Sequence, residues 1–598
     1  MKSVNVLKIC LSAIILSIVV VSASAMPPYQ GIKEPDALKA MRLKGMDSPK
    51  DGLIQQLLAK DANAKISGSR EYPVVMGYFT DLANINTQGE FQTMLFSNAT
   101  GVKSVNNYYR DMSYNAMSCS GSVANWVTSG NTVAYFGNGT NGFTNGTTNN
   151  AYEFIRAVLT NSDASVDFSQ PEYDQDHDGY VDVLWVVHAG KGGEEGGTEP
   201  IWSHSWSLSY WSGGTYYTTG DISTYTGQPV RINEYIIMPE RTNWADGVGA
   251  TTEMIGAGVF CHEFGHALGL PDLYDTGDSG PGIGNWSIMA GGSWGGNGIT
   301  NATPVQMDVW CKRFLGWAMP TRITNDNLYT VNSIMTTASG SSYKLAKLGA
   351  DTTKQFWLIE NRRSAATGSV SGVAWDQYIY NSGLAIYHID STYTTTTYLN
   401  ANTVNASNTR PYGVALEETD QTTAGYSSEL YNGTNSGDAA DVWNSGTQTS
   451  FDSVGTAYPV TYLNGTNSTT GGARTLTAIR AIPAASAAMA CSMFVGVPTG
   501  VEGEPAAVSV PAVFALQNAW PNPARGQVNF KYQLPQAAMV DLKVYNVLGQ
   551  KIKTFEMGVQ NPGYYSIKWS AANVAEGVYF IRLQAGNYQA TKKFVVVK

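Results

Sequence analysis

Hydrophobic and polar positions divide this chain of 598 residues into stretches of distinct character. An apolar run extends from Ile9 to Val21, and a polar stretch rich in Lys and Asp separates it from the first strong strand pattern, Tyr72 to Phe79. From there to about residue 250, strand patterns alternate with a few helical ones. We therefore predict a mixed α/β (α+β) domain in which helices pack on a mixed sheet.

Beyond that domain the pattern becomes β-rich. Thr251 to Phe260 contains no proline and is predicted to be helical, as is Pro304 to Trp317. From about Leu328 to Val497, short β runs alternate with loops rich in Gly, Ser, Thr and Asn. After a linker rich in Pro, Ala, Val and Glu, Phe514 to Lys598 has the size and strand pattern of an immunoglobulin-like β-sandwich.

The N-terminus has the features of a secretory signal. Lys2 and Lys8 precede the apolar run, and small residues end it, which predicts cleavage after Ala25. The alternative is an uncleaved anchor. No other apolar run is long enough to span a membrane, so we expect no transmembrane segment in the mature chain.

Composition and charge agree with export. The net charge is −10 and charged residues make up 14% of the chain, so nothing favours nucleic-acid binding. Of the five cysteines, all but Cys10 remain after signal removal. An oxidising destination permits up to two disulfides, and Cys261 with Cys311 is the best candidate pair.

The most informative pattern is HEFGHALGLPD, which begins at His262. On a helix His262 and His266 share one face, so two imidazoles can bind one metal ion. Glu263 can then lie beside the open coordination position and take a proton from water. A glycine and a proline end the helix, so that Asp272 can turn back as a third ligand. Zinc fits, since it needs no redox change and tolerates an open fourth position.

This pattern and the later run SIMAGG, which contains Met289, resemble the immune inhibitor A family of metallopeptidases. Matching segments extend over roughly residues 71 to 495. The resemblance implies a metzincin-like zinc peptidase, with Met289 in a tight turn beneath the metal. Many metzincins have a third histidine and some a tyrosine after the turn, which this chain lacks. The group that stabilises the oxyanion is therefore open between Tyr274 and His204.

A second candidate metal site precedes the apolar strand Val183 to Val187. Its carboxylates surround Gly179 at near-alternate positions, a spacing that suits calcium. The predicted ligands are Asp174, Asp176, Asp178, the Tyr180 carbonyl and Asp182. The loop is not an EF-hand, because Trp185 stands where a bidentate glutamate is required. The alternative is an acidic surface turn.

Other acidic residues allow less specific predictions. In the β-rich region Glu417, Glu418, Asp420, Asp438 and Asp441 could hold another cation, although solvated loops are the simpler interpretation. Residues 26 to 70 contain no cysteine and no histidine, which excludes a cysteine switch from a propeptide there. If latency acts through the metal, an acid such as Asp36, Asp47 or Asp51 must supply the oxygen. A flexible leader is the alternative.

The C-terminal unit carries a second resemblance. Pro521-Asn522-Pro523, the run VDLKVYNVLG from Val540 to Gly549, and Lys592-Lys593 resemble the C-terminal sorting domain of bacterial type IX secretion. The resemblance implies the type IX secretion machinery as a partner, and a secreted protein or one attached to the bacterial outer surface. The alternative is a plain Ig-like spacer.

These patterns lead to one interpretation of the whole chain. We predict a signal peptide (1–25), a propeptide (26–70), a zinc metallopeptidase catalytic domain (71–320), its β-rich continuation (321–497), a linker (498–513) and an Ig-like sorting domain (514–598). The predicted function is a secreted zinc-dependent endopeptidase acting on proteins or peptides, with Glu263 as general base. The alternative is an exported adhesin or glycan- or protein-binding protein with an inactive peptidase-like domain.

Overall fold

The computed structural model describes most of the chain. The described residues are 24–29, 32–43, 66–243, 253–277, 280–338, 340–346, 354–364, 369–406, 412–420, 430, 433, 435–452, 477–495, 513–536, 538–560, 563–572 and 574–597. Most of the predicted signal peptide and of the predicted linker lie outside them.

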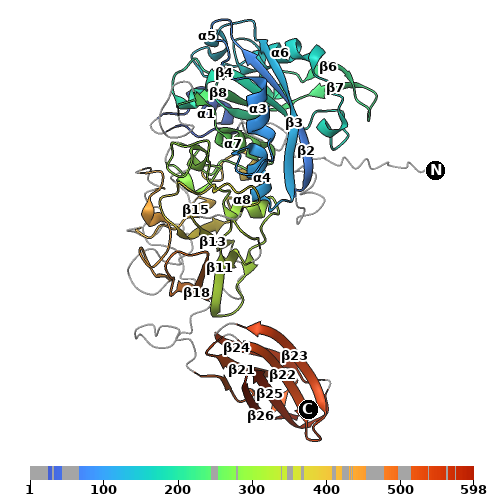
Figure 1. Cartoon of the computed structure of the whole chain (residues 1–598), viewed down its shortest axis with the longest axis vertical. Coiled ribbons are helices and arrows are strands. Elements are labelled where there is room, and N and C mark those ends of the chain that lie inside the picture. The colour runs from blue at the N-terminus through green and yellow to red at the C-terminus, as the bar shows by residue number, and fades with distance from the viewer. Residues whose placement is uncertain are drawn as a thin grey trace, which may run out of the picture.

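A seven-stranded sheet forms the centre of the first domain (Figure 1). Its order is β1-β5-β8-β4-β2-β3, with β9 paired to β8. The strands are β1 (Ser24–Ala25), β2 (Gly68–Tyr78), β3 (Met117–Thr128), β4 (Leu184–Lys191), β5 (His204–Ser207), β8 (Glu234–Thr242) and β9 (Glu253–Met254). Strands β2, β3, β4 and β8 are parallel, whereas β5 is antiparallel to β8 and β1 to β5. The N-terminal segment is thus the outermost strand beside β5.

Helices pack on this sheet, as predicted for a mixed α/β domain. They include α1 (Asp36–Leu43), α3 (Gln88–Phe96), α4 (Val105–Met112), α5 (Val133–Gly137), α6 (Ala151–Ser162) and α7 (Ala257–Ala267), and β6 (Tyr217–Ile222) and β7 (Pro229–Ile232) form a hairpin. Thr87, Ser104 and Asn150 begin α3, α4 and α6 by accepting a backbone N–H of the first turn. α3 contacts β3, α6 contacts β2 and β3, and α7 contacts β8.

Both helices predicted after residue 250 begin later than the sequence pattern suggested. α7 starts at Ala257, because β9 precedes it and Gly256 is its N-cap. Only Val309–Phe314 (α8) of the second predicted helix is helical. Asp308 sets this start, since its side chain accepts the backbone N–H of Trp310 and of Cys311.

The following region is β-rich, as predicted, and forms two sheets of order β10-β12-β13-β14-β15 and β11-β18-β17-β16. Its elements are β10 (Thr321–Arg322), β11 (Asn327–Asn332), β12 (Ser342–Leu345), β13 (Gln355–Arg362), β14 (Gly383–Asp390), α9 (Thr396–Asn400), β15 (Val414–Leu416), β16 (Ser450–Asp452), β17 (Ala478–Arg480) and β18 (Ala488–Phe494). Leu358 and Tyr387 of this region belong to the same buried core as the first domain. The region is therefore packed as a continuation of that domain.

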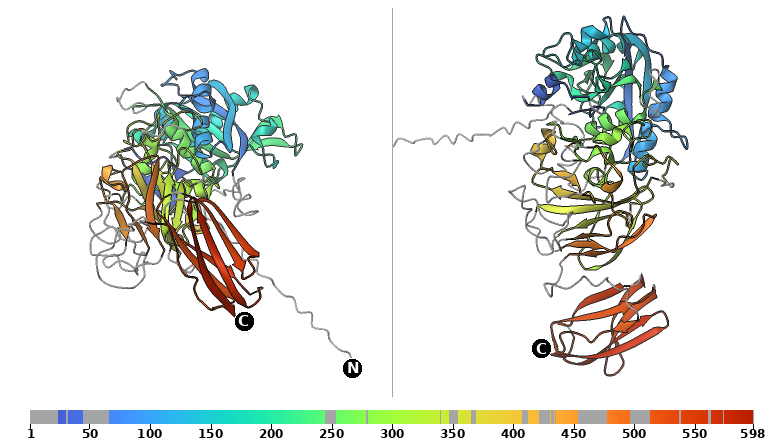
Figure 2. Two further views of the ribbon diagram at one scale, coloured as in Figure 1. Left: turned by 60° about the horizontal axis from the view of Figure 1, so that its bottom comes forward. Right: turned by 90° about the vertical axis from the view of Figure 1, so that its left-hand side faces the viewer.

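The C-terminal residues form two sheets of their own (red in Figure 2). Their orders are β19-β21-β24 and β20-β26-β25-β22-β23. The strands are β19 (Ala515–Leu516), β20 (Ala524–Arg525), β21 (Gln527–Leu534), β22 (Ala538–Asn546), β23 (Lys551–Gln560), β24 (Gly563–Ser570), β25 (Gly577–Ala585) and β26 (Tyr588–Val597). Alternating residues such as Phe530, Leu542 and Phe594 form a separate core. Among the described residues, no helix has both the length and the apolar character needed to cross a bilayer.

The predicted disulfide between Cys261 and Cys311 is not formed. All four cysteines outside the predicted signal peptide are free and buried. Burial raises the pKa of both the Cys261 and the Cys311 thiol far above its usual range. Both residues belong to the same buried core, and the Cys311 thiol also interacts with the side chains of Asp308 and Ser287.

Candidate metal centre

Helix α7 carries the first three residues of the candidate site. His262 and His266 lie one helical turn apart, and Glu263 directly follows His262. All three side chains are fully buried. Ionisable side chains are rarely buried unless they are paired, hydrogen-bonded or bound to a metal. Their burial therefore indicates a site and not a surface face of the helix.

A tight turn at the end of α7 brings the next residue of the site back. Gly269 has a φ of +94°, a left-handed conformation that glycine adopts without a steric penalty. Its N–H donates to the carbonyl of His266, and the N–H of Leu270 donates to that of Gly265. After this turn Asp272 lies against the two histidines.

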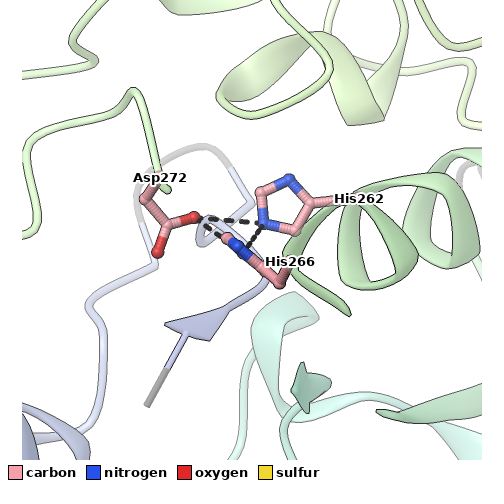
Figure 3. A group of neighbouring side chains, drawn as sticks. All are labelled: His262, His266 and Asp272. Carbon is pink, nitrogen blue, oxygen red and sulfur yellow. Dashed lines mark hydrogen bonds and ion pairs between the residues drawn. The ribbon is translucent and has the colours of Figure 1, made fainter. Parts of the chain in front are cut away.

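The three predicted ligands converge on one point (Figure 3). The Nε2 atoms of His262 and His266 are 3.0 Å apart, and Asp272 Oδ1 lies 3.2 Å from the first and 3.1 Å from the second. Ligand atoms at about 2.0–2.1 Å from a tetrahedral zinc ion would be about 3.3–3.4 Å from one another. The donor set and its spacing therefore fit zinc after a small outward movement.

Backbone carbonyls fix the orientation of both imidazoles. Nδ1 of His262 lies 2.8 Å from the carbonyl oxygen of Ile288, and Nδ1 of His266 lies 2.8 Å from that of Leu270. A carbonyl only accepts hydrogen bonds, so Nδ1 carries the proton and the Nε2 lone pair faces the site.

A residue of the β-rich region holds the third ligand. Asn402 Oδ1 accepts the backbone N–H of Asp272 at 2.7 Å, and Asn402 Nδ2 donates to Asp272 Oδ2 at 2.5 Å. Oδ1 of Asp272 is thereby directed at the histidines. Asn402 could not be predicted from the sequence, because it lies 130 residues away from Asp272 in a loop with no pattern that would single it out.

Met289 packs against the helix that carries the histidines. It is fully buried, and a Cβ atom added to Gly265 would come within 2.6 Å of its sulfur. Its carbonyl accepts the N–H of Leu273 at 2.7 Å. Met289 thus packs against α7 at Gly265, between the two histidines, and its backbone binds the segment that follows Asp272.

The N-terminal segment crosses the same site. The carbonyl oxygen of Ala25 lies 3.3 Å from Nε2 of His262. The carbonyls of the next two residues accept hydrogen bonds from the indoles of Trp202 (2.9 Å) and Trp294 (3.1 Å). A backbone carbonyl therefore faces the histidines where the sequence suggested an acidic side chain. Asp36 is exposed on α1 and does not fill that place, and Asp47 and Asp51 lie outside the described residues.

The two candidates for stabilising an oxyanion have different surroundings. The hydroxyl of Tyr274 lies within donating distance of two acceptors, the Ala25 carbonyl at 2.9 Å and Oε1 of the buried Glu34 at 3.3 Å. Both ring nitrogens of His204 are engaged, Nδ1 by the carbonyl of Trp202 (2.7 Å) and Nε2 by the hydroxyl of Tyr235 (2.9 Å). Burial lowers the pKa of His204 to about 4. Tyr274 is thus the candidate that contacts the backbone at the site.

The predicted calcium loop is a compact acidic turn. Carboxylate oxygens of Asp174, Asp176 and Asp182 lie within 4.8 Å of one another. Asp178 is outside this group, and its carboxylate accepts the backbone N–H of Tyr180 at 2.7 Å. Burial raises the pKa of Asp182 to about 7, with a smaller contribution from Asp176. The cluster is therefore costly to charge without a cation.

The acidic residues of the β-rich region do not form a comparable cluster within the described ranges. Glu417 lies 3.4 Å from Nδ1 of His388, and its carboxylate accepts the indole N–H of Trp357 at 3.1 Å. Asp441 accepts the indole N–H of Trp286 at 2.7 Å. Glu417, Glu418 and Asp441 are buried, so the expectation of solvated loops was wrong for these three residues. Protein groups donate hydrogen bonds to the carboxylates of Glu417 and Asp441.

Two regions of the chain match known protein families. Residues 78–322 match the immune inhibitor A peptidase M6 catalytic domain. The chain carries an M6 peptidase domain. Residues 518–597 match the secretion system C-terminal sorting domain. Both resemblances noted in the sequence are confirmed.

Curated metalloproteases resemble the M6 peptidase region. It is 31% identical over 276 residues to the pre-pro-metalloprotease PrtV of Vibrio cholerae, an alignment that covers 41% of this chain and 28% of that protein. It is 31% identical over 232 residues to immune inhibitor A of Bacillus thuringiensis subsp. alesti, covering 36% of this chain and 32% of that protein. The chain spans less than a third of the length of these relatives.

Two solved structures of Porphyromonas gingivalis proteins also match part of the chain. Dimeric latent PorU matches 20% of this chain and 12% of its own at 17% identity, with a TM-score of 0.13. PorZ, a surface component of the type-IX secretion system, matches 23% of this chain and 20% of its own at 16% identity, with a TM-score of 0.12. These scores are too low to bear on the fold.

Proposed function

We propose that this protein is a zinc-dependent endopeptidase that hydrolyses peptide bonds in proteins. The observation that carries the proposal is the convergence of His262, His266 and Asp272 at the end of α7, with ligand atoms 3.0–3.2 Å apart. The M6 match and the metalloprotease names of the relatives support it. The packing of Met289 against α7 supports a metzincin-like arrangement.

The residues of the site have distinct roles in this proposal. Zinc held by three protein ligands would polarise the scissile carbonyl and lower the pKa of a water molecule. Glu263 lies on the same helix as the histidines and would take a proton from the attacking water and pass it to the leaving amide nitrogen. Because the site is buried, electrostatic interactions there are stronger than in bulk water.

We also infer that the N-terminal segment keeps the enzyme latent. After the predicted cleavage behind Ala25, the segment that begins at Met26 is still held at the site, because the Met26 nitrogen lies 3.1 Å from the carbonyl oxygen of Ser203 and the Met26 carbonyl accepts the indole N–H of Trp202 at 2.9 Å. A substrate cannot reach the histidines while this backbone occupies the approach. A synthetic peptide of residues 26–38 should therefore inhibit the processed enzyme, whereas a scrambled peptide of the same composition should not.

The remaining parts have supporting roles. The group of Asp174, Asp176 and Asp182 suits a structural calcium ion. The two sheets of the C-terminal unit suit an Ig-like sandwich. As the sorting domain it would interact with the type IX secretion machinery, which would place the enzyme outside the cell or on its outer surface.

Casein hydrolysis combined with metal analysis tests the proposal. The processed protein should contain one zinc ion per chain and cleave casein, and a chelator should abolish cleavage until zinc is restored. Glu263→Gln should keep the zinc and lose nearly all activity, since it removes the proton acceptor but retains the side-chain shape. A zinc-loaded wild-type protein that leaves casein intact would instead favour an exported binding protein with an inactive peptidase-like domain.

A further inference from the structure

A cavity of about 320 Å³ lies on the far side of α7 from the candidate metal centre. Phe264 and Leu268 form part of its wall, and each follows a candidate histidine ligand by two residues, which places it about 200° further round the helix. The starts of β2, β4 and β8 enclose the remainder. The volume is within the range of small-molecule sites. The cavity is therefore large enough for a small ligand and is separate from the approach to the histidines.

Arg70 of β2 brings an unused hydrogen-bond donor to the wall of this cavity. The residue is only 7% exposed, and one of its terminal nitrogens donates to Oε1 of Gln175 at 3.0 Å. Within the part of the chain that the structure describes, its Nε has no hydrogen-bond partner. A buried donor without an acceptor is unfavourable, and each such group in a folded protein calls for an explanation. A ligand oxygen bound beside the guanidinium group would supply an acceptor.

The other charged groups of the wall are carboxylates. Asp176, Asp178 and Asp182 of the acidic turn and Glu234 at the start of β8 line the cavity. An ionised carboxylate only accepts hydrogen bonds, whereas the Arg70 guanidinium only donates them. A ligand that contacts both must therefore offer acceptors and donors together. Hydroxyl groups do so, and they carry no charge that either set of groups would repel.

Tyr216 adds an accessible aromatic ring to the same wall. It is 42% exposed, and its ring lies 5.8 Å from that of Tyr180 in an edge-on arrangement. The Arg231 guanidinium is 4.1 Å from the centre of the Tyr180 ring and 5.7 Å from that of Tyr216, so Tyr216 is the less covered of the two. The C–H groups of a sugar ring pack well on the negative face of an aromatic ring. Tyr216 therefore offers a surface for the apolar side of a sugar.

We propose that this cavity binds a neutral hexose unit of a glycan. Tyr216 packs against the C–H face of the sugar, Arg70 donates to one of its oxygens, and the carboxylates accept hydrogen bonds from its hydroxyl groups. The site lies outside the proposed peptidase machinery, so the proposal depends neither on zinc nor on Glu263. Through it the protein holds either a glycoprotein or a polysaccharide, which are two sources of the same sugar chemistry.

Ligand-observed NMR titration of the processed protein in calcium-containing buffer tests the proposal. The probes are the methyl glycosides of glucose, mannose, galactose and N-acetylglucosamine. At least one of them should bind with a Kd on the order of 1 mM or lower. Binding should persist in Glu263→Gln, because the cavity is separate from the metal centre. Loss of peptidase activity and loss of sugar binding are therefore distinguishable.

The variant Tyr216→Ala assigns the binding to this cavity. It should weaken the best sugar about 3–10-fold, while Tm and the cleavage of an unglycosylated peptide stay at wild-type values. Tyr225→Ala is the matched control, since Tyr225 is 43% exposed and stacks on His177 but does not line the cavity. It should bind the sugar as the wild type does. Absence of binding by all four glycosides, or equal weakening in the two variants, would overturn the proposal.

Two further comparisons define the ligand. Binding of free lysine or glutamate in the cavity, with no binding of the glycosides, would overturn the neutral ligand class. The source of the sugar follows from cleavage of one glycoprotein before and after enzymatic removal of its glycans. Faster cleavage of the glycosylated form, lost in Tyr216→Ala, assigns the sugar to the protein substrate. Equal cleavage, together with retention on a polysaccharide column that Tyr216→Ala reduces, assigns it to a polysaccharide, and both outcomes support the site.

Discussion

Asn402 binds Asp272 through both ends of its side-chain amide. Its oxygen accepts the backbone N–H and its nitrogen donates to the carboxylate, so position and orientation of the third candidate ligand are both fixed. Asn402 belongs to the β-rich region, beyond the last residue matched to the M6 domain. The candidate metal centre is therefore completed by a part of the chain that the family match does not include.

Removing this support should weaken metal binding. We expect Asn402→Ala to lower zinc affinity about 10–100-fold, the usual effect of losing a partner that orients a ligand. Competition with a chromogenic chelator measures this directly. Asn444→Ala is a suitable control, because Asn444 is also buried and bonds to a backbone carbonyl, that of Ser382. Equal zinc affinity in both variants would contradict the role of Asn402.

A buried ion pair between Arg362 and Asp376 should contribute strongly to the stability of the β-rich region. Nε and one terminal nitrogen of Arg362 each donate to Asp376 at 2.7 Å, and the other terminal nitrogen donates to the carbonyl of Trp286 at 2.8 Å. Arg362→Met leaves a buried carboxylate without its cation, which we expect to cost about 3–5 kcal/mol.

Urea denaturation followed by tryptophan fluorescence measures this loss. Arg480→Met is the comparison, since Arg480 pairs with Asp452 at 3.1 Å but both side chains are partly exposed. It should cost less than about 1 kcal/mol. Similar losses in the two variants would mean that burial does not set the contribution of the Arg362 pair.

Calcium should stabilise the protein more at pH 8 than at pH 5. The folded-state pKa of Asp182 is raised to about 7 from an ordinary value of 3.8, mainly by burial. A raised pKa favours folding below pH 4, and this contribution is lost as pH rises towards 7, where the proton must leave. A bound calcium ion would neutralise the carboxylate charge of Asp182 once its proton has left.

Thermal unfolding with and without calcium at the two pH values provides the measurement. The calcium-dependent rise in Tm should be small at pH 5 and larger at pH 8, and Asp174→Asn should reduce it at pH 8. A calcium effect that is independent of pH and of Asp174 would place the ion elsewhere.

Reducing agent should leave the folded protein unchanged. All four cysteines outside the predicted signal peptide are free and buried, so no covalent link contributes to the described fold. Unfolding curves with and without dithiothreitol should coincide. A lower Tm in the presence of dithiothreitol would instead support the disulfide between Cys261 and Cys311 that the sequence predicted.

The sequence predicted the local part of the candidate centre well. His262, His266 and Asp272 lie within eleven residues, and helix geometry followed by the glycine turn suffices to bring them together. Contacts between distant segments could not be predicted in this way. Asn402 sits in an unremarkable loop, and the approach of Ala25 depends on strand pairing across almost the whole first domain. The cysteine pairing was wrong because core packing, and not spacing along the chain, decides which sulfur atoms meet.

When the N-terminal segment is removed, strand β5 becomes an open edge of the sheet. Its free N–H and C=O groups are common to every polypeptide and can pair with any extended stretch. A folded protein offers few such stretches, since its backbone groups are already hydrogen-bonded. The rate at which a protein substrate is cleaved would then depend on how often it unfolds locally, so that damaged or denatured proteins would be cleaved faster than intact ones.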